Sequence, residues 1–203
     1  MPMNNYEKMR EAARLRFLQY DPEQLSRKPG VTNREDFLET CFLGELCRIS
    51  KTTGHIFFPN REESADFSES LSIYDWLCDR REDAVAANRF CMVHSLPGIV
   101  VSGSGLTMNC DSVAPLIARN RKAFLALCDT MGGRNADGAD LAVKINAFPD
   151  LPVLLKFYDG DEEFPASLSL LWDENVLDFI RYETVYYLAG CLLRRLKTLN
   201  SYI

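Results

Sequence analysis

Four carboxylates stand within five residues of the chain, and side chains of this type can do chemistry when they lie close together. They are Asp159, Asp161, Glu162 and Glu163. Carboxylate oxygens bind hard divalent cations, and neighbouring carboxylates raise one another's pKa, which can create a general acid or base. We therefore take this acidic turn as a candidate ligand-binding site, with Asp161, Glu162 and Glu163 as candidate metal ligands. The alternative is a solvated hairpin tip in which one glutamate caps a nearby cation.

Three side chains near the turn complete the candidate ligand-binding set. Phe164 and Trp172 could line a pocket, although aromatic residues of strands more often fill a core. Lys156 could share a sheet face with Lys144, and two like charges repel there unless a carboxylate or a bound anion lies between them. The sequence carries no cofactor fingerprint, so a divalent metal is the cofactor that this pattern allows.

Histidines and cysteines offer little further chemistry. His55 and His94 are far apart in the sequence, and pairing Cys91 with His94 as nucleophile and base would depend on geometry that a sequence does not give. The seven cysteines include no CxxC pair, so we expect no disulfide framework, zinc site or iron–sulfur cluster. The run Gly103-Ser104-Gly105 lacks the third glycine of a dinucleotide loop.

Strands that alternate between apolar and polar residues must hold the acidic turn in place. Residues 151–158 and 166–172 alternate with a period of two on either side of the turn, and residues 141–145 do so before them. This pattern predicts an antiparallel meander of three strands with one face on a core. Its other face would carry Lys144, Lys156, Ser167 and Ser169.

The remaining elements alternate between helices and hairpins. Apolar residues at helical spacing predict helices over 5–20, 66–78, 114–131, 174–180 and 183–199, with a short turn of helix after Asp21-Pro22. Asp66 and Glu69 have the spacing of a capping box. A hairpin is expected over 37–43 and 45–50, with further strands at 55–58, 89–94 and 99–101. We predict an α+β fold, an antiparallel sheet of meander hairpins packed with about four to six helices, as one domain over residues 1–203.

The stretch FPDLPVLLKFYDGDEEFPASLSLLWD, residues 148–173, resembles the signature of the DUF3786 family of uncharacterised bacterial and archaeal proteins. In that family a Phe-Pro turn leads into an apolar strand, a Gly-Asp-Glu-Glu-Phe-Pro-Ala turn and a second strand, here ending in Leu171-Trp172-Asp173. Gly132-Gly133 and Phe42-Leu43-Gly44 match the family's order of parts, and the resemblance covers roughly residues 6–199. It implies a protein of anaerobes. Some members resemble fusions to a four-cysteine iron–sulfur module, which this sequence lacks.

Length and charge bound the class of protein. The 203 residues carry a net charge of −6 and no basic stripe, so we expect no nucleic-acid partner. No segment approaches the ~20 apolar residues that cross a bilayer, and the start of the sequence has no leader-like apolar region, so we expect a cytoplasmic protein without a membrane partner.

These observations favour a soluble, non-catalytic accessory protein of anaerobic metabolism that binds an unknown protein or small molecule, and they leave open whether it is an enzyme. One alternative is a metal-assisted enzyme that uses the turn from Asp159 to Glu163. The other is an assembly protein, a possible homodimer that packs through its tyrosine-rich face of Tyr182, Tyr186 and Tyr187.

Overall fold

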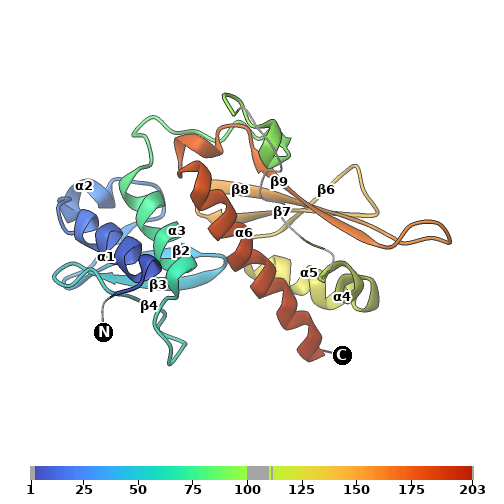
Figure 1. Cartoon of the computed structure of the whole chain (residues 1–203), viewed down its shortest axis with the longest axis horizontal. Coiled ribbons are helices and arrows are strands. Elements are labelled where there is room, and N and C mark those ends of the chain that lie inside the picture. Colours follow the sequence, from blue (N-terminus) through green and yellow to red (C-terminus); the bar gives the residue numbers. More distant parts are fainter. Residues whose placement is uncertain (1–2, 100–109, 111, 203) are drawn as a thin grey trace.

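The computed structural model describes residues 3–99, 110 and 112–202. Within this range the chain forms two antiparallel sheets and six α-helices, which confirms the α+β class (Figure 1). The run Gly103-Ser104-Gly105 and all but the first residue of the strand predicted over 99–101 lie outside the described residues.

The first sheet is built on the predicted hairpin. Its strands are β1 (Thr32–Asn33), β2 (Phe37–Phe42), β3 (Glu45–Ser50) and β4 (Ile56–Phe57), in that order and all antiparallel. The hairpin turns at Leu43 and Gly44, which have φ values of 47° and 79°. Two successive positive φ values are typical of the tight two-residue turns whose twist matches that of paired strands.

The second sheet contains the predicted meander and extends it at both edges. Its order is β5 (Phe90–Cys91), β9 (Ser167–Asp173), β8 (Leu151–Tyr158), β7 (Leu141–Phe148) and β6 (Arg134–Ala136). Lys156 lies opposite Ser169 on one side and Ala142 on the other. Val153, Leu155 and Phe157 point to the opposite face and are buried, so the period-two pattern of the sequence predicted the core face correctly. On the face of Lys156, Leu154 and Ala142 are buried as well.

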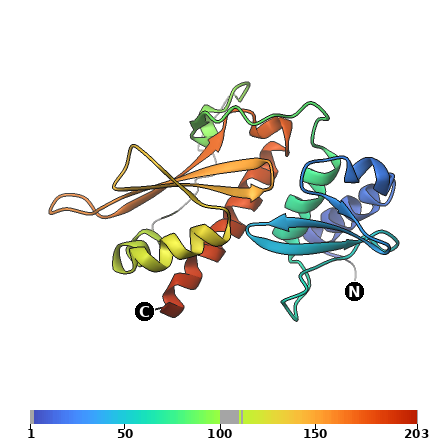
Figure 2. The same cartoon turned by 180° about the vertical axis from the view of Figure 1, so that it is seen from behind.

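Helices α1 (Asn5–Phe17) and α3 (Phe67–Cys78) cover one face of the first sheet, which lies in front of α3 in Figure 2. The long helix α6 (Tyr182–Lys197) packs against α3 and crosses between the two sheets (Figure 1). The predicted capping box of α3 is present, because Asp66 accepts from the backbone of Glu69 and Glu69 from that of Asp66. The other helices are α2 (Pro22–Ser26), α4 (Ala114–Arg119) and α5 (Arg121–Thr130).

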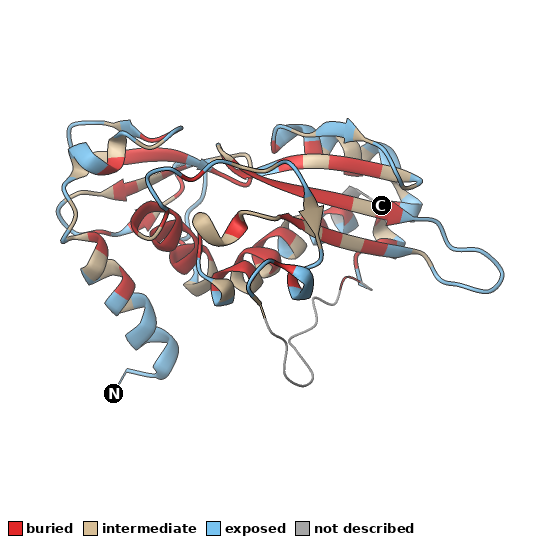
Figure 3. Cartoon of the chain, turned by 90° about the horizontal axis from the view of Figure 1, so that it is seen from above, coloured by how far each residue is buried: buried red, intermediate tan, exposed pale blue. Residues whose placement is uncertain are grey.

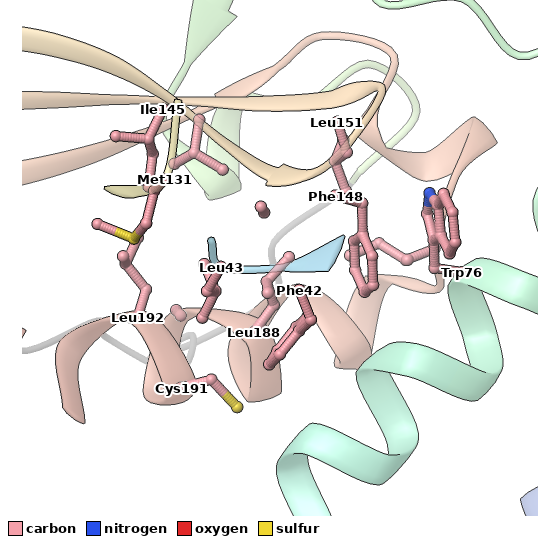
Figure 4. Close-up of a cluster of buried hydrophobic side chains, with 14 of the residues drawn as sticks. Phe42, Leu43, Trp76, Met131, Ile145, Phe148, Leu151, Leu188, Cys191 and Leu192 are labelled. Atoms are coloured by element: carbon pink, nitrogen blue, oxygen red, sulfur yellow. The ribbon is translucent and has the colours of Figure 1, made fainter. Parts of the chain in front are cut away.

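The two sheets meet at their turns and share one core. The backbone N–H of Leu43 in the β2–β3 turn donates to the carbonyl of Ala147 in β7, at 2.9 Å. Around this contact the buried side chains of both sheets, of α3 and of α6 form one continuous cluster (Figures 3 and 4). Figure 4 shows Phe42 of β2, Phe148 of β7 and Leu188 of α6 within it. The junction is therefore packed as a protein interior.

Helix α3 lies deep in this core. All of residues 69–78 are buried, including the polar Asp75. The Asp75 carboxylate accepts a hydrogen bond from Arg16 of α1 at 2.6 Å and another from the hydroxyl of Thr184 in α6. A buried carboxylate is tolerated where charge and hydrogen bonds compensate for the lost water. Asp75 thus joins three helices around one charge.

Three sequence expectations are wrong in detail. The single helix predicted over 114–131 is two helices, because Asn120 leaves the helical conformation and its side chain caps α5 by accepting from the N–H of Ala123 at 3.0 Å. The helix predicted over 174–180 is only a 3₁₀ turn, Val176–Asp178. The strand predicted over 89–94 is the short β5, which ends at Cys91. A 3₁₀ turn, Val93–Ser95, follows it.

Among the described residues, no helix combines the length and the apolar character that crossing a membrane requires.

The close approach of the β2–β3 turn to the end of α5 at Gly44 can be tested with a matched pair of glycine substitutions. Gly44 and Gly98 both have positive φ, 79° and 80°, but a Cβ at Gly44 would collide with the carbonyl of Thr130, whereas one at Gly98 would meet no atom of the described residues within 4 Å. Each Gly→Ala change costs about 1–2 kcal/mol for its backbone conformation. We expect Gly44→Ala to cost at least about 1 kcal/mol more than Gly98→Ala, because the junction must also shift. Urea denaturation measures both, and equal losses would contradict the packing described.

Candidate functional site

The acidic turn forms the tip of the β8–β9 hairpin and is exposed along its whole length, residues 159–165 (Figures 1 and 3). The carboxylate of Asp161 accepts hydrogen bonds from the backbone N–H groups of Phe164 and Glu163, both at 2.8 Å, and these bonds lower its pKa. Asp159 pairs with Arg121 of α5. These two carboxylates therefore hold the turn in shape.

The candidate set from the sequence is spread over three places. Phe164 lies at the tip with 67% of its surface exposed, Lys156 lies on the outer face of the sheet, and Trp172 is fully buried in the core. Among the described residues, no three His, Cys, Asp or Glu side chains lie together in a way that could hold a metal ion. The structure thus does not assemble Asp161, Glu162 and Glu163 into a metal centre. Ligand binding by the tip stays a prediction.

A cavity of about 590 Å³ lies elsewhere, between α2 and the end of α3. Helix α2 begins where the sequence predicted, with Asp21 accepting from the N–H of Glu23 at 3.0 Å and with Pro22 in the first turn. The chain from α2 faces the end of α3 and the loop that follows it across the cavity. Its lining residues are Tyr20, Asp21, Gln24, Leu25, Arg27, Lys28, Pro29, Cys78, Arg80 and Glu82.

Lys28 is the half-buried cation of this cavity. Its ammonium donates a hydrogen bond to the carbonyl of Leu77 at the end of α3, where the helix dipole favours a positive charge. Burial lowers the pKa of Lys28, because the charged form loses water. Among the described residues, no carboxylate lies within ion-pair distance of its ammonium. The neighbouring Cys78 is buried too, which raises the pKa of its thiol to about 11.

Arg80 lines the same cavity, and its side chain is only 5% exposed. Its guanidinium donates to the carbonyl of Ala84 at 3.1 Å and lies 2.7 Å from Asp150 Oδ2, an ion pair without the angles of a hydrogen bond. The Nε atom is buried and has no hydrogen-bond partner in the part of the chain that the structure describes. A buried guanidinium with an unused donor is costly unless a further acceptor reaches it.

The β7–β8 turn, Phe148-Pro149-Asp150, positions Arg80. The indole N–H of Trp76 in α3 donates to Asp150 at 3.0 Å, and the Trp76 ring stacks on Phe148 with 4.6 Å between centroids (Figure 4). Pro149 packs directly on Gly30, where a Cβ would overlap its ring. The turn therefore fixes both sides of the cavity: the chain after α2 through Gly30, and the chain after α3 through Arg80.

Sequence reasoning missed this cavity. Arg80 stands in the charge run 79–83, which is typical of a solvated loop, and its neighbours Arg81, Glu82 and Asp83 are indeed exposed. Lys28 stands before a Pro-Gly pair and is typical of a helix end. The signal that could have found the site is the Phe148-Pro149-Asp150 run, because an Asp after an apolar strand end needs a partner when it is half-buried.

The tyrosines predicted as a dimer face are partly occupied within the chain. The hydroxyls of Tyr182 and Tyr186 lie 2.9 Å apart, and Tyr187 packs edge-on against Phe67 with 5.2 Å between ring centroids. The three side chains thus meet different neighbours, and a homodimer through them stays a prediction.

Comparison with family models gives one finding. Residues 21–195 match a domain of unknown function, DUF3786. Neither the curated proteins nor the solved structures include a match. The match begins at the N-cap of α2 and ends in the last turn of α6, so it includes the cavity residues from Asp21 onwards and the turn that positions Arg80.

Removal of the Asp150 carboxylate would show how much its pair with Arg80 contributes to the stability of the folded protein. Asp150→Ala leaves the Arg80 charge buried without its partner, and the loss of one member of a buried pair costs about 3–5 kcal/mol. We expect Asp150→Ala to lower the free energy of unfolding by about 3 kcal/mol. Asp159→Ala breaks an exposed pair with Arg121 and should cost less than about 1 kcal/mol. Similar losses in urea denaturation would mean that the Asp150 pair is not a buried constraint.

The burial of Lys28 predicts a pH dependence of stability. The pKa of Lys28 is lower in the folded protein than in the unfolded chain, where it is about 10.4. Between the two values the unfolded chain binds more protons, so this lysine makes wild-type stability rise with pH. We expect the stability of Lys28→Met minus that of wild type to fall as the pH rises towards the unfolded-chain pKa of about 10.4. Lys122→Met, at an exposed position outside the cavity, serves as the control. If the difference for Lys28→Met rose with pH instead, the pKa of Lys28 would be raised in the folded protein, which would contradict this prediction.

Proposed function

The chain belongs to the DUF3786 family, and from that premise we propose that it is a non-catalytic binding protein that holds a small anionic ligand in the cavity around Lys28. The observation that carries the proposal is the half-buried ammonium of Lys28, which lines a cavity without a carboxylate partner among the described residues. A buried charge in that position destabilises the folded protein, and a bound anion would offset this cost.

The size and lining of the cavity suit a small molecule. Pockets that bind small ligands usually have volumes of about 300–1,000 Å³ and combine apolar walls with a few polar groups, and this one has about 590 Å³. Leu25 and Pro29 supply apolar surface, and Leu25 is almost fully buried. Arg27, which is exposed, adds a second cation at the rim. A ligand with an apolar body and one anionic group fits this lining.

Unused hydrogen-bonding capacity at Lys28 supports an anion as the ligand. An ammonium has three donors, and in the described structure Lys28 uses one of them, on the Leu77 carbonyl. Arg80 is engaged by Asp150 and the Ala84 carbonyl, and its Nε atom is buried away from solvent. Charge-assisted hydrogen bonds to carboxylate or phosphate oxygens are the strong ones, so Lys28 gains more from an anion than from a neutral ligand.

The thiol in the cavity supports binding rather than catalysis. The nucleophilic form of cysteine is the thiolate, and burial holds Cys78 protonated at neutral pH, with a pKa of about 11. Two carboxylates line the cavity, Asp21 and Glu82, and Asp21 is occupied as the N-cap of α2.

Other functional predictions from the sequence are not tested by these contacts. The metal-assisted enzyme at the acidic turn, the homodimer and the accessory role in anaerobic metabolism stay predictions. Thermal shifts with magnesium, manganese, calcium and zinc would report on the first of them, because a ligand that binds the folded state stabilises it.

Binding of simple anions tests the proposal. We expect inorganic phosphate, pyrophosphate or succinate to raise the melting temperature at constant ionic strength, and isothermal titration to give a dissociation constant. Lys28→Met should weaken that constant about tenfold or more, because a hydrogen bond to a charged group contributes about 1.5–3 kcal/mol.

Lys122→Met serves as the control, because Lys122 is exposed on α5 and does not line the cavity; its binding should match wild type. The proposal fails if none of the three anions binds at millimolar concentration, or if Lys28→Met binds them as well as wild type does.

A further inference from the structure

Lys28 has surroundings that suit a chemical step as well as an electrostatic one. We infer, building on the proposed anion pocket, that Lys28 captures its ligand reversibly as an imine, and that the ligand is an aldehyde or ketone that also carries a carboxylate or phosphate group. The inference comes from three features of the cavity: an amine that lines it without a carboxylate partner among the described residues, a buried guanidinium beside it, and a thiol that stays neutral.

An amine attacks a carbonyl only in its neutral form, so the groups that surround Lys28 decide whether it can react. Burial is the largest influence on its pKa and lowers it, and the positive charge of Arg80 lowers it further. Amines that are desolvated or placed next to another cation are the ones that react with carbonyl compounds.

Three acidic groups near Lys28 act in the opposite direction. Cys78, Asp79 and Asp150 would each raise the lysine pKa. The thiol of Cys78 carries no charge at neutral pH, since its own pKa is about 11. Asp79 is 2.6 Å from Arg181 and 3.0 Å from Arg16, and Asp150 pairs with Arg80. Their negative charges are therefore largely compensated by arginines, and the net shift of the pKa remains downward.

The same cavity provides groups for the anionic part of the ligand. Arg80 and Arg27 both line it, Arg80 as a buried positive charge paired with Asp150 and Arg27 at the exposed rim. A carbonyl compound that also carries a negative charge would therefore be held by an arginine while its carbonyl carbon meets Lys28. A neutral carbonyl compound of similar size would lack this attraction, and we expect the cavity to select against it.

The reaction needs no oxidant or reductant. The lone pair of the Lys28 nitrogen forms a bond to the carbonyl carbon, and the carbonyl π electrons move to oxygen, which takes a proton. The nitrogen then loses its protons, the hydroxyl leaves as water, and a carbon–nitrogen double bond remains. Water reverses both steps, so the ligand is released unchanged.

Reductive trapping tests the inference on the unmodified protein. Glyoxylate supplies an aldehyde with a carboxylate, and cyanoborohydride delivers hydride to the imine carbon, which makes the linkage permanent. Peptide mapping by mass spectrometry then measures the labelling rate of each lysine. At neutral pH we expect glyoxylate to label Lys28 several-fold faster than the exposed Lys8 and Lys122, because burial lowers the pKa of Lys28 and leaves more of its amine neutral.

Two controls separate imine formation from simple anion binding. Propanal, an aldehyde without a charge, should favour Lys28 over Lys8 less than glyoxylate does, because it gains from the neutral amine but not from the nearby arginines. Lys28→Arg keeps the cation but cannot form an imine, so it should still bind phosphate while the fast-labelled site disappears.

Labelling of Lys28 at the rate of the exposed lysines, in a protein that binds phosphate, would overturn the imine and leave the anion pocket intact. Fast labelling without measurable phosphate binding would support the imine and remove the proposed selectivity for simple anions. Equal preference for propanal and glyoxylate at Lys28 would overturn the anionic part of the ligand.

Discussion

The half-buried carboxylate of Asp150 is the interaction on which the rest of this structure depends. It lies in the β7–β8 turn and meets two groups from the other half of the molecule: the indole of Trp76 and the guanidinium of Arg80. Both partners are almost fully buried, so they can be there only if a hydrogen-bond acceptor and a negative charge reach them. The turn that provides this carboxylate also presents Phe148 to the face of Trp76. One turn therefore satisfies the polar groups and fills the apolar space at the junction of the two sheets.

The cavity around Lys28 follows from the same constraint. Segments 20–29 and 78–82 form its walls, and each is fixed by the turn that carries Asp150, one through the contact of Pro149 with Gly30 and the other through Arg80. Because these contacts hold the backbone on both sides, the cations in the cavity have defined positions before any ligand arrives. Such preorganisation reduces the entropy that a ligand must lose on binding.

Local patterns of the sequence predicted local structure well, and contacts between distant segments decided the rest. Alternating residues gave the meander with the correct core face, and Asp66 with Glu69 gave the start of α3. The break at Asn120 was missed because the apolar periodicity continues through it, while the side chain of one residue caps the second helix. The cavity was missed because the carboxylate that allows Arg80 to be buried lies 70 positions later in the chain. No local sequence pattern indicates such a contact. The dense carboxylates at 159–163 drew attention as a site, yet two of them hold a hairpin tip in shape.

The complete burial of residues 69–78 has a consequence for how the protein comes into being. Helix α3 is covered by α1 on one side and by α6 and the turn at Asp150 on the other, and the second of these two sides is encoded more than 70 residues downstream. As the polypeptide leaves the ribosome from its N-terminal end, Trp76 and its apolar neighbours emerge long before the segments that shield them. Part of the apolar surface of α3 is therefore exposed during much of synthesis, the stage at which chaperones act. Helix α3 is fully covered only after α6 has left the ribosome.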